Sequence, residues 1–515
     1  MRRVLLASTL ALAAALLAFS ALMSAWAPLG GWPNRIFGEP AWYEFDPGSF
    51  YVAAAHDLHF GTPALFLGHP GTPLLLLLEG VQRGVYAFSD DAGLSDAAFT
   101  ARHLPVVFLA SKLLMTILHL VSFAFLFAFA RQLLRDELAA WCACLGYATS
   151  LPVLHYVSRI SVEPLMMICI FASFLALWRW EDLEGKGNAM RARLFAALAG
   201  VAVATGLVTK FNFLVPLPFL LLLEGALAPR AAGPGQRARE RSLALLALTS
   251  AAVVTLWFWS NWIDWILFFS FWSGVPPLWN SATRIWNLWP APTAAGVLPL
   301  AEFAFVSVAV VGWVDVVRRG AAPRRRVVFV SLFAAYTLVV FAYRVYLERS
   351  FLPFHYFVPA AGILTVFFGA ATARVLRGLT HSLPVAAAAG ALWLLVIHGL
   401  AVYATVDSRL RDVAFYQELR PTFEWIARLA PQQRIGVREE VFEAREFASK
   451  VASLHTIMLP APSAKAGGSS VRHEFESLFV PVPAARADGL TGGIFVAALG
   501  TELFAVEVPA AAVSP

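Results

Sequence analysis

The sequence predicts an all-α polytopic membrane protein with about eleven transmembrane helices, followed by a small α/β domain outside the membrane. Three observations support this fold class. The 515 residues are 59% hydrophobic and 14% charged, with a mean hydropathy of +0.68, whereas soluble domains carry roughly 25% charged residues. Apolar runs long enough to cross a bilayer recur along most of the chain. Arginines concentrate in alternate loops between these runs, as in proteins whose basic loops face the cytoplasm.

Polar or Pro/Gly-rich segments separate the predicted spans, and each span covers roughly 16–28 residues. The spans begin near Val4, Pro105, Leu138, Pro164, Phe195, Phe211, Leu243, Val297, Val327, Leu352 and Val385. We therefore predict a transmembrane domain at 1–406, which includes a long first outer loop at 28–104, and a soluble domain at 407–515. The first span ends in Ala25-Trp26-Ala27, so a cleavable signal peptide is an alternative for this segment alone.

A cytoplasmic N-terminus makes every cytoplasmic loop basic. The basic residues assigned to these loops are Arg131, Arg135, Arg179, Lys186, Arg191, Arg193, Arg230, Arg237, Arg239, Arg241, Arg318, Arg319, Arg324, Arg325, Arg326, Arg374 and Arg377. An odd number of spans then places the C-terminal domain outside, which in a bacterial inner membrane is the periplasm. Topology thus accounts for the excess of 39 basic over 33 acidic residues, and no nucleic-acid partner is predicted.

The C-terminal segment is much less apolar than the rest of the chain. A probable helix runs from Thr422 to Leu429. Short β-like runs cover Arg434 to Val437, His455 to Leu459, Ile494 to Leu499 and Leu503 to Val508. These patterns predict a small α/β domain of roughly 100 residues. Three cysteines, Cys142, Cys144 and Cys169, all lie in apolar runs, which argues against a disulfide framework and a zinc site.

Two carboxylates, Glu44 and Asp46, lie among aromatic residues in the first outer loop. An amphipathic stretch from Val52 to His59 follows them. A carboxylate that is half-desolvated at the membrane surface can take a proton from a hydroxyl group or hold a cation. The alternative is that Asp46 caps a helix that begins at Pro47, and the two roles are compatible.

The next two outer loops also carry ionisable residues. Glu163 begins a span four residues after Arg159, so these two side chains can simply pair. Lys210 lies between two apolar helices on the outer side, where positive charge is unusual. Binding of a lipid phosphate would explain this lysine, and the alternative is a snorkelling side chain.

Together these loops resemble those of membrane-embedded GT-C glycosyltransferases, and most closely the protein O-mannosyltransferase and aminoarabinose lipid A transferase group. The elements that match in order are Asp46, Tyr51, Gly61-Thr62-Pro63, His69-Pro70-Gly71-Thr72-Pro73-Leu74, Tyr156-Val157-Ser158-Arg159, Glu163, Gly206-Leu207, Thr209-Lys210 and His355-Tyr356-Phe357-Val358-Pro359. The resemblance covers roughly residues 1–405. The family usually shows Asp-Glu where this chain has Asp46-Pro47, so Glu44 is the alternative catalytic acid.

The resemblance implies a GT-C-like enzyme that transfers a hexosyl or pentosyl group from a polyprenyl-phosphate sugar to a hydroxyl group on a lipid, glycan or protein acceptor. It implies that Asp46 or Glu44 is the general base, and that Glu163 orients the acceptor or helps to bind a divalent cation. The residues implied for the donor phosphate are Lys210, Arg159, His355 and Tyr356, and those implied for substrate are Tyr51 and His69. The expected partners are the donor, the acceptor and membrane lipids. We predict no cofactor and no essential metal, with a divalent cation as the alternative.

Alternatives remain for both the metal and the function. His56, Asp57, His59 and His69 form a candidate metal-binding cluster. The alternative is that His56 and His59 lie on the wet face of an amphipathic helix and bind nothing. Lys112, His119 and Asp264 lie within or near spans, as expected for a lipid-linked sugar flippase or transporter. The polar residues nevertheless collect on one side and no repeat is evident, which favours an enzyme. A non-catalytic subunit of envelope polysaccharide assembly is a third possibility.

Overall fold

The structure is a computed structural model of the full chain. It describes residues 15, 48–59, 72–89, 96–150, 153, 157, 159–210, 214–228, 235–273, 297–320, 322–348, 354–378, 435–438, 479–482, 494–499 and 502–507. The chain divides into two compact units. The first comprises Met1–Ala18, Leu67–Leu74 and Met115–Val406, and the second comprises Phe19–Phe66, Leu75–Leu114 and Asp407–Pro515.

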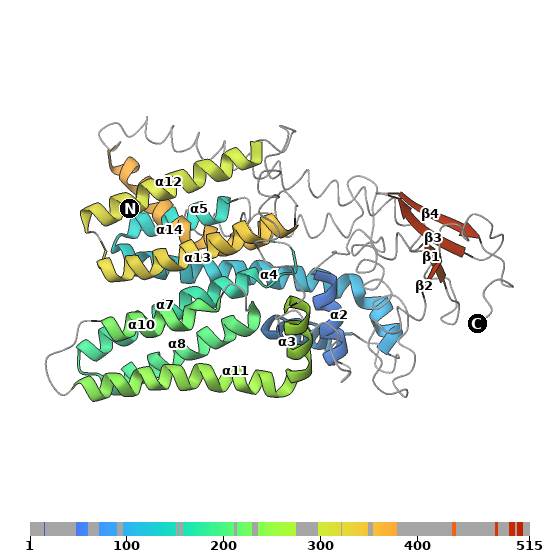
Figure 1. The fold of residues 1–515 in the computed structure, drawn as a ribbon, viewed down its shortest axis with the longest axis horizontal. Helices are drawn as coiled ribbons and strands as arrows, with labels where there is room; N and C mark the ends of the chain where they lie inside the picture. Colours follow the sequence, from blue (N-terminus) through green and yellow to red (C-terminus); the bar gives the residue numbers. More distant parts are fainter. Residues whose placement is uncertain are drawn as a thin grey trace. The chain divides into compact units, whose positions relative to one another are not determined.

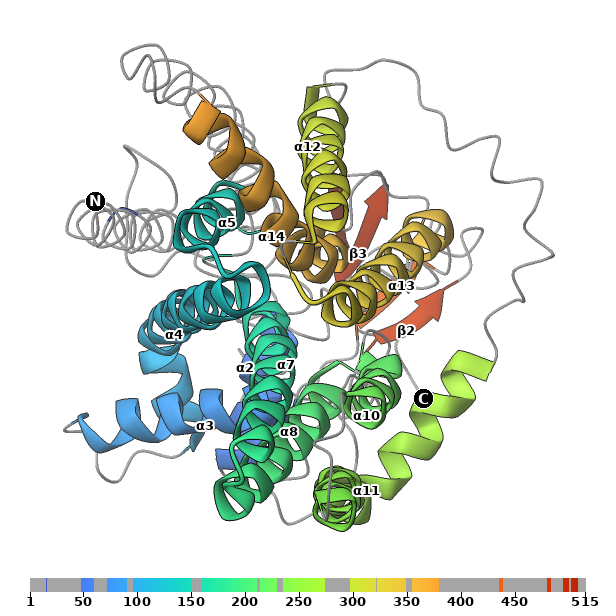
Figure 2. The ribbon, with the colours of Figure 1, turned by 90° about the vertical axis from the view of Figure 1, so that its left-hand side faces the viewer.

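Long helices make up the described part of the first unit (Figure 1). Their bounds are α4 Asp96–Leu134, α5 Glu137–Thr149, α7 Glu163–Gly185, α8 Ala189–Thr209, α10 Pro216–Leu227, α11 Gly235–Ser273, α12 Val297–Arg319, α13 Arg324–Glu348 and α14 Phe354–Gly378. The boundary between the two units falls within α4. Figure 2 views these helices nearly end-on, with α14 beside α5, α12 and α13. Helix α8 packs against both α7 and α11.

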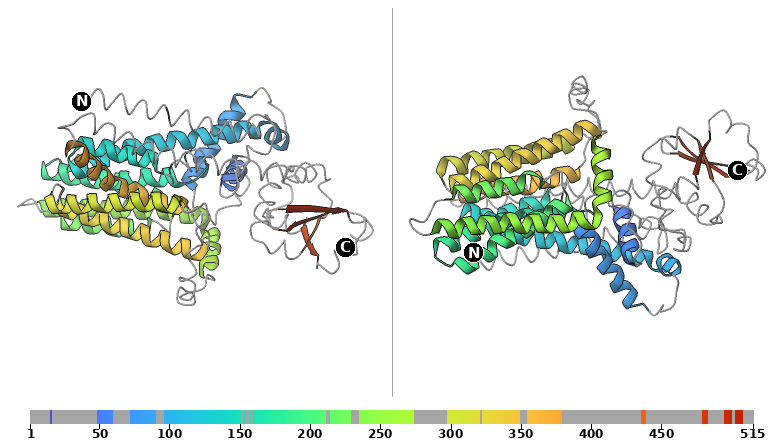
Figure 3. Two further views of the ribbon diagram at one scale, coloured as in Figure 1. Left: turned by 90° about the horizontal axis from the view of Figure 1, so that it is seen from above. Right: turned by 60° about the horizontal axis from the view of Figure 1, so that its bottom comes forward.

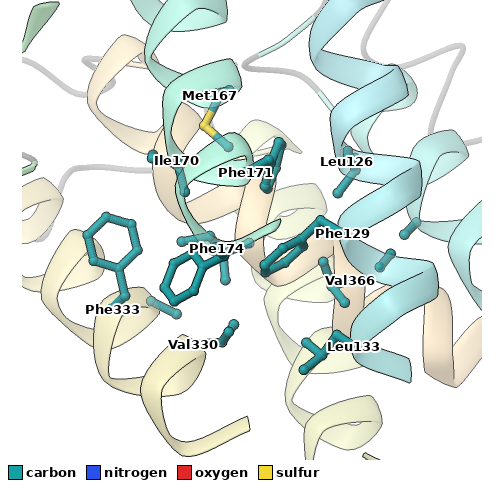
Figure 4. Close-up of a cluster of buried hydrophobic side chains, with 14 of the residues drawn as sticks. Leu126, Phe129, Leu133, Met167, Ile170, Phe171, Phe174, Val330, Phe333 and Val366 are labelled. Atoms are coloured by element: carbon teal, nitrogen blue, oxygen red, sulfur yellow. The ribbon is translucent and has the colours of Figure 1, made fainter. Parts of the chain in front are cut away.

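Aromatic side chains fill the centre of this bundle (Figure 4). The ring of Phe129 on α4 lies 5.2 Å from that of Phe171 and stacks on Trp178 at 5.1 Å between centroids. Phe174 contacts Phe333 of α13 edge to face. All five side chains are at most 1% exposed. Because large aromatic groups bury the most apolar area per residue, they fix the positions of α4, α7 and α13 relative to one another.

The predicted spans that begin between Pro105 and Leu352 coincide with helices α4 to α14, although two helices are shorter than expected. Helix α5 has 13 residues and α10 has 12. Helix α5 ends at Thr149, and the backbone N–H of the next residue, Ser150, bonds to the carbonyl of Tyr147. The spans predicted near Val4 and Val385 lie outside the described residues except for Ala15, so the total of eleven stays a prediction.

Five helical segments among the described residues are long and apolar enough to cross a membrane. They are Val106–Leu134, Glu163–Gly185, Ala189–Thr209, Arg324–Ala342 and Phe357–Gly378. The helix ends that flank the turns from α7 to α8, from α10 to α11 and from α12 to α13 lie at one end of the bundle (Figure 1). Most of the arginines predicted to be cytoplasmic lie in or beside these turns. The multi-pass membrane architecture that the sequence predicts is therefore present, and the direction of insertion stays a prediction.

Ion pairs connect the helices at this basic end. The carboxylate of Glu181 on α7 accepts hydrogen bonds from Arg325 at 2.8 and 2.9 Å and from Arg326 at 3.0 Å. The guanidinium of Arg326 also lies over the ring of Trp178, 5.0 Å from its centroid. These contacts hold the start of α13 against the end of α7.

Besides the first part of α4, the described part of the second unit contains helix α2, most of helix α3 and a sheet. Helix α2 spans Gly48–His59 and α3 spans Thr72–Ala87. The strands are β1 Ile435–Arg438, β2 Phe479–Val482, β3 Ile494–Leu499 and β4 Glu502–Glu507. They form one four-stranded sheet in the order β2-β1-β3-β4, drawn in red in Figure 3. Strand β1 pairs in parallel with β2 and β3, and β3 pairs antiparallel with β4.

Three of the four predicted strands are present, within one residue of the expected positions, and β2 was not predicted. The predicted helix Thr422 to Leu429 and the β-like run His455 to Leu459 lie outside the described residues. An α/β domain at 407–515 and the domain limits of the sequence analysis therefore stay predictions. The three cysteines are free and buried, as their apolar surroundings in the sequence indicate.

Candidate functional site

The candidate site lies where α7 begins, at the end of the bundle opposite the basic turns (Figure 1). Pro164 stands in the first turn of α7, where its missing N–H leaves no hydrogen bond unmade. Glu163 occupies the same turn and is 1% exposed. A carboxylate is favoured here because the unpaired N–H groups make a helix N-terminus electropositive.

Lys210 follows the last residue of α8 and is 5% exposed. Its backbone N–H bonds to the carbonyl of Gly206 at 2.9 Å, which closes the end of the helix. Gly206 is needed for close packing. A Cβ atom there would lie 2.7 Å from Leu214 Cδ1 and 3.1 Å from the Cβ atom of Cys169. The Gly-Leu-x-Thr-Lys turn thus lets α7 and the residues after α8 approach each other and directs Lys210 inward.

Lys210 and Glu163 form a buried ion pair. The Nζ atom of Lys210 donates a hydrogen bond to Oε1 of Glu163. The snorkelling alternative for Lys210 is wrong, because its ammonium group is withdrawn from the surface and paired with a carboxylate. Two charges buried in this way are retained at a large desolvation penalty, and an ionisable pair inside a membrane protein is by default a candidate functional site.

The segment before α7 anchors this pair against α4. Thr116 of α4 donates through its hydroxyl to the carbonyl of Val157 at 3.3 Å. Arg159 is half-buried. Ser161 is fully buried, and its hydroxyl has no hydrogen-bond partner among the described residues. This hydroxyl, two residues from Glu163, is therefore a further polar group at the site.

Sequence analysis did not single out Tyr147, which is fully buried on α5 and close enough to Glu163 to interact with its charge. Its ring packs edge to face against Phe123, with centroids 5.3 Å apart. Lys112 and His119 on α4 are also at most 1% exposed. The signal for all three is the same: a polar side chain within an otherwise apolar span, which lipid would not tolerate on the outside of the bundle.

Several predicted site residues cannot be placed beside the pair. Glu44, Asp46 and His69 lie outside the described residues. Tyr51 lies on α2 and is fully buried. Helix α2 begins at Gly48, close to the start predicted after Asp46. His355 and Tyr356 lie in the first turn of α14, and their side chains are outside the described part.

The described residues contain no group of three or more His, Cys, Asp or Glu side chains arranged to hold a metal ion. His69, and the side chains of His56, Asp57 and His59, fall outside what is described. The divalent cation of the sequence analysis therefore stays an open alternative. The chemical capacity of the described site lies in one buried cation and one buried carboxylate, which can bind an anionic group and a hydroxyl group respectively.

Comparison with solved structures identifies the fold. The chain superposes on ArnT from Cupriavidus metallidurans bound to undecaprenyl phosphate with a TM-score of 0.53 and 14% identity, covering 95% of this chain and 93% of that one. The apo state of the same protein gives a TM-score of 0.52 and 14% identity, with the same coverage. Archaeal oligosaccharyltransferase AglB from Archaeoglobus fulgidus, in complex with an inhibitory peptide and a dolichol-phosphate, gives 0.49 and 13% identity, with 87% of this chain and 64% of that chain covered.

This chain thus spans less than two thirds of AglB and nearly all of ArnT. No protein-family model and no curated protein sequence matches it. The likeness to ArnT shows the fold, which is the GT-C fold of membrane glycosyltransferases. The predicted GT-C-like architecture is therefore confirmed.

Proposed function

We propose that the protein is a membrane glycosyltransferase that moves a sugar from a polyprenyl phosphate to a hydroxyl acceptor on the outer face of a bacterial inner membrane. The observation that supports this most directly is the buried pair of Lys210 and Glu163 at the end of the bundle away from the basic turns. The GT-C fold is consistent with it, and ArnT, which has this fold, was solved with undecaprenyl phosphate.

In the proposed site Lys210 binds the donor phosphate. A lysine ammonium is a compact cation suited to a phosphate oxygen, and its hydrogen bond to Glu163 holds it at the site. As the bond from the sugar to the phosphate breaks, negative charge grows on the leaving phosphate and its interaction with Lys210 strengthens. Arg159, His355 and Tyr356 would add further contacts to this group.

The acceptor hydroxyl attacks the anomeric carbon from the side opposite the phosphate, so that the configuration inverts. Asp46, or Glu44 as the alternative, takes the hydroxyl proton, a step that typically accelerates a reaction by about 10²–10⁴-fold. Glu163 holds Lys210 in place and orients the acceptor. Tyr51 and His69 would contact the substrate. The products are the glycosylated acceptor and the free polyprenyl phosphate.

A reconstitution assay tests this function. Purified protein in lipid vesicles receives a radiolabelled polyprenyl-phosphate sugar and a cell-envelope lipid or glycan fraction as acceptor. We expect label to move to the acceptor as polyprenyl phosphate is released. Asp46→Asn should abolish release while the protein still accumulates in the membrane. If Asp46→Asn retains activity and Glu44→Gln loses it, Glu44 is the base.

The role of Lys210 is tested by the dependence of rate on donor concentration. Lys210→Ala should raise the donor concentration needed for half-maximal release, and Lys186→Ala at the opposite end of the bundle is the control. An unchanged donor dependence in Lys210→Ala would contradict the phosphate role. Movement of intact donor across the vesicle membrane without bond cleavage would instead support the flippase. The buried Lys112 and His119 of α4 are ionisable residues within a span, which mark transport pathways in membrane proteins.

A further inference from the structure

Tyr147 lies near the end of α5, where side chains of α4, α7 and α14 surround it. Its side chain is fully buried, and its ring packs edge to face against Phe123 of α4 with 5.3 Å between centroids. A Cβ atom at Gly362 of α14 would lie 3.4 Å from Cε2 of Tyr147 and 2.2 Å from Cε of Met167 on α7. Contacts with three helices therefore fix the position of the phenol ring.

Packing does not explain the hydroxyl group of Tyr147. This hydroxyl group has no hydrogen-bond partner of ordinary geometry among the described residues. A buried hydroxyl group without a partner is destabilising, because it has given up its hydrogen bonds to water. Phenylalanine would make the same ring contacts without that penalty. A tyrosine at this position therefore indicates that its hydroxyl group takes part in an interaction of the working site.

Two acceptors lie near this hydroxyl group, the hydroxyl oxygen of Ser122 and the carboxylate of Glu163. Ser122 donates its own proton to the backbone carbonyl of His119 at 2.7 Å. Glu163 is the stronger acceptor, since a hydrogen bond to a charged group is roughly twice as strong as one between neutral groups. Glu163 also stands one turn before Met167, on the face of α7 that meets the phenol ring.

The carboxylate of Glu163 can accept hydrogen bonds from Lys210 and Tyr147 at the same time. Lys210 donates to Oε1, and an ionised carboxylate has about four lone-pair positions on its two oxygens. The last torsion of a glutamate side chain is broad, so one hydrogen bond leaves the carboxylate able to turn. A second donor from α5 would fix the direction in which Glu163 presents its charge to Lys210.

We propose that Tyr147 is a positioning residue: its hydroxyl group donates to the carboxylate of Glu163 and holds this carboxylate against the ammonium group of Lys210 while the donor phosphate is bound. The inference rests on the proposed function, in which Lys210 binds that phosphate. The phosphate and the carboxylate are both anionic and repel each other across the lysine. The hydrogen bond from Tyr147 keeps the carboxylate in place against this repulsion, without any contact between Tyr147 and the substrate.

Infrared difference spectroscopy tests the hydrogen bond without sugar transfer. The spectrum of the Glu163→Gln protein is subtracted from that of the wild type, which isolates the carboxylate stretching band of Glu163. The same subtraction is made in a Tyr147→Phe background, where only the hydroxyl group is lost. Tyr336→Phe is the matched control, because it makes the same chemical change to a half-buried ring on α13. We expect the band to shift in Tyr147→Phe and to stay in place in Tyr336→Phe.

The dependence of release on donor concentration tests the positioning role. Tyr147→Phe should raise the donor concentration for half-maximal release by about tenfold, the factor that corresponds to a weak hydrogen bond to a charged group. The maximal rate should change much less. In a Glu163→Gln background the same substitution should have little further effect, because Tyr147 acts through Glu163. A residue that served only packing would instead lower the maximal rate through loss of folded protein and leave the donor dependence unchanged.

A carboxylate band at the same frequency with and without the hydroxyl group of Tyr147 would overturn the proposal, whatever the activity of the protein. So would an equal rise in the half-maximal donor concentration with and without Glu163, since Tyr147 would then act by another route. A wild-type protein that releases no polyprenyl phosphate would overturn the proposed function and the role in donor binding. A band shift in Tyr147→Phe would still support the hydrogen bond to Glu163, so the two failures are distinguishable.

Discussion

Lys210→Met removes an ammonium group that is 5% exposed and leaves Glu163, which is 1% exposed, without the cation that it contacts. Methionine is apolar and of similar length, so the main change is the loss of the charge. Breaking a buried ion pair by removing one partner costs about 3–5 kcal/mol. We therefore expect the free energy of unfolding to fall by about that amount in Lys210→Met, and by a similar amount in Glu163→Leu.

The double variant Lys210→Met/Glu163→Leu should be far less affected. It removes both desolvation penalties and replaces two charges with apolar groups, a change that is often neutral or stabilising by about 1–4 kcal/mol. The four proteins form a double-mutant cycle. A lone buried lysine can lose its proton, which lowers the cost of Glu163→Leu, so we expect a coupling energy of at least about 2 kcal/mol.

The assay is reversible denaturation in mixed detergent micelles, followed by circular dichroism at a fixed pH. Lys186→Met is the matched control because Lys186 is exposed, and it should change stability by no more than about 0.5 kcal/mol. A coupling energy below about 0.5 kcal/mol would refute the reasoning, since it would mean that Lys210 and Glu163 are solvated or apart. The double variant also separates stability from activity: it should fold and still fail to bind the donor phosphate.

Two further changes probe the packing and the basic end of the bundle. In Gly312→Ala the new Cβ atom would lie 1.9 Å from the backbone oxygen of Phe367, so α12 and α14 must separate and stability should fall by about 1–3 kcal/mol in the same denaturation assay. Asp136 caps α5 through the N–H of Leu138 and pairs with Arg377 at 2.6 Å, so Asp136→Ala should cost about 0.5–2 kcal/mol at neutral pH.

Each of these changes has a control and a clear contrary outcome. Gly80→Ala meets open space and should be neutral or stabilising, so an equal loss in Gly80→Ala and Gly312→Ala would exclude steric conflict as the cause. Burial raises the pKa of Asp136, but the hydrogen bond and charge of Arg377 and the backbone N–H donors lower it more, to below 3.8. The stability that this carboxylate contributes is therefore present above pH 3.8 and is lost as the pH falls through the folded-state pKa. A difference between wild type and Asp136→Ala that persists below that pKa would contradict this.

The sequence predicted the membrane helices well because their signal is local. A run of about 20 apolar residues has few alternatives to crossing a bilayer, and the arginine-rich turns collect at one end of the bundle as the loop charges indicate. Strands β1, β3 and β4 were predicted from alternation over a few residues. Strand β2 was missed because it contains Pro481, which argues against a strand. The sheet order explains why a proline is nevertheless present in this strand: β2 lies at an edge of the sheet, where a missing backbone N–H is tolerated.

Local sequence patterns did not predict which residues of the candidate site contact each other. Sequence analysis chose Glu163 and Lys210 separately. It offered Arg159 as a partner for Glu163, and for Lys210 either a lipid phosphate or a snorkelling position. Their contact joins residues 47 positions apart, and it depends on how closely α7 and α8 pack, which Gly206 permits. Tyr147 was overlooked because a single phenol is a weak signal within an apolar span, and its complete burial is visible only in the packed bundle.

Composition and short-range spacing thus determined that this chain crosses a membrane, where its helices run and which residue types are too polar to face lipid. Only the tertiary structure decided which of those polar residues meet, because the energy of a buried charge depends on the atoms that surround it and not on its neighbours in the chain.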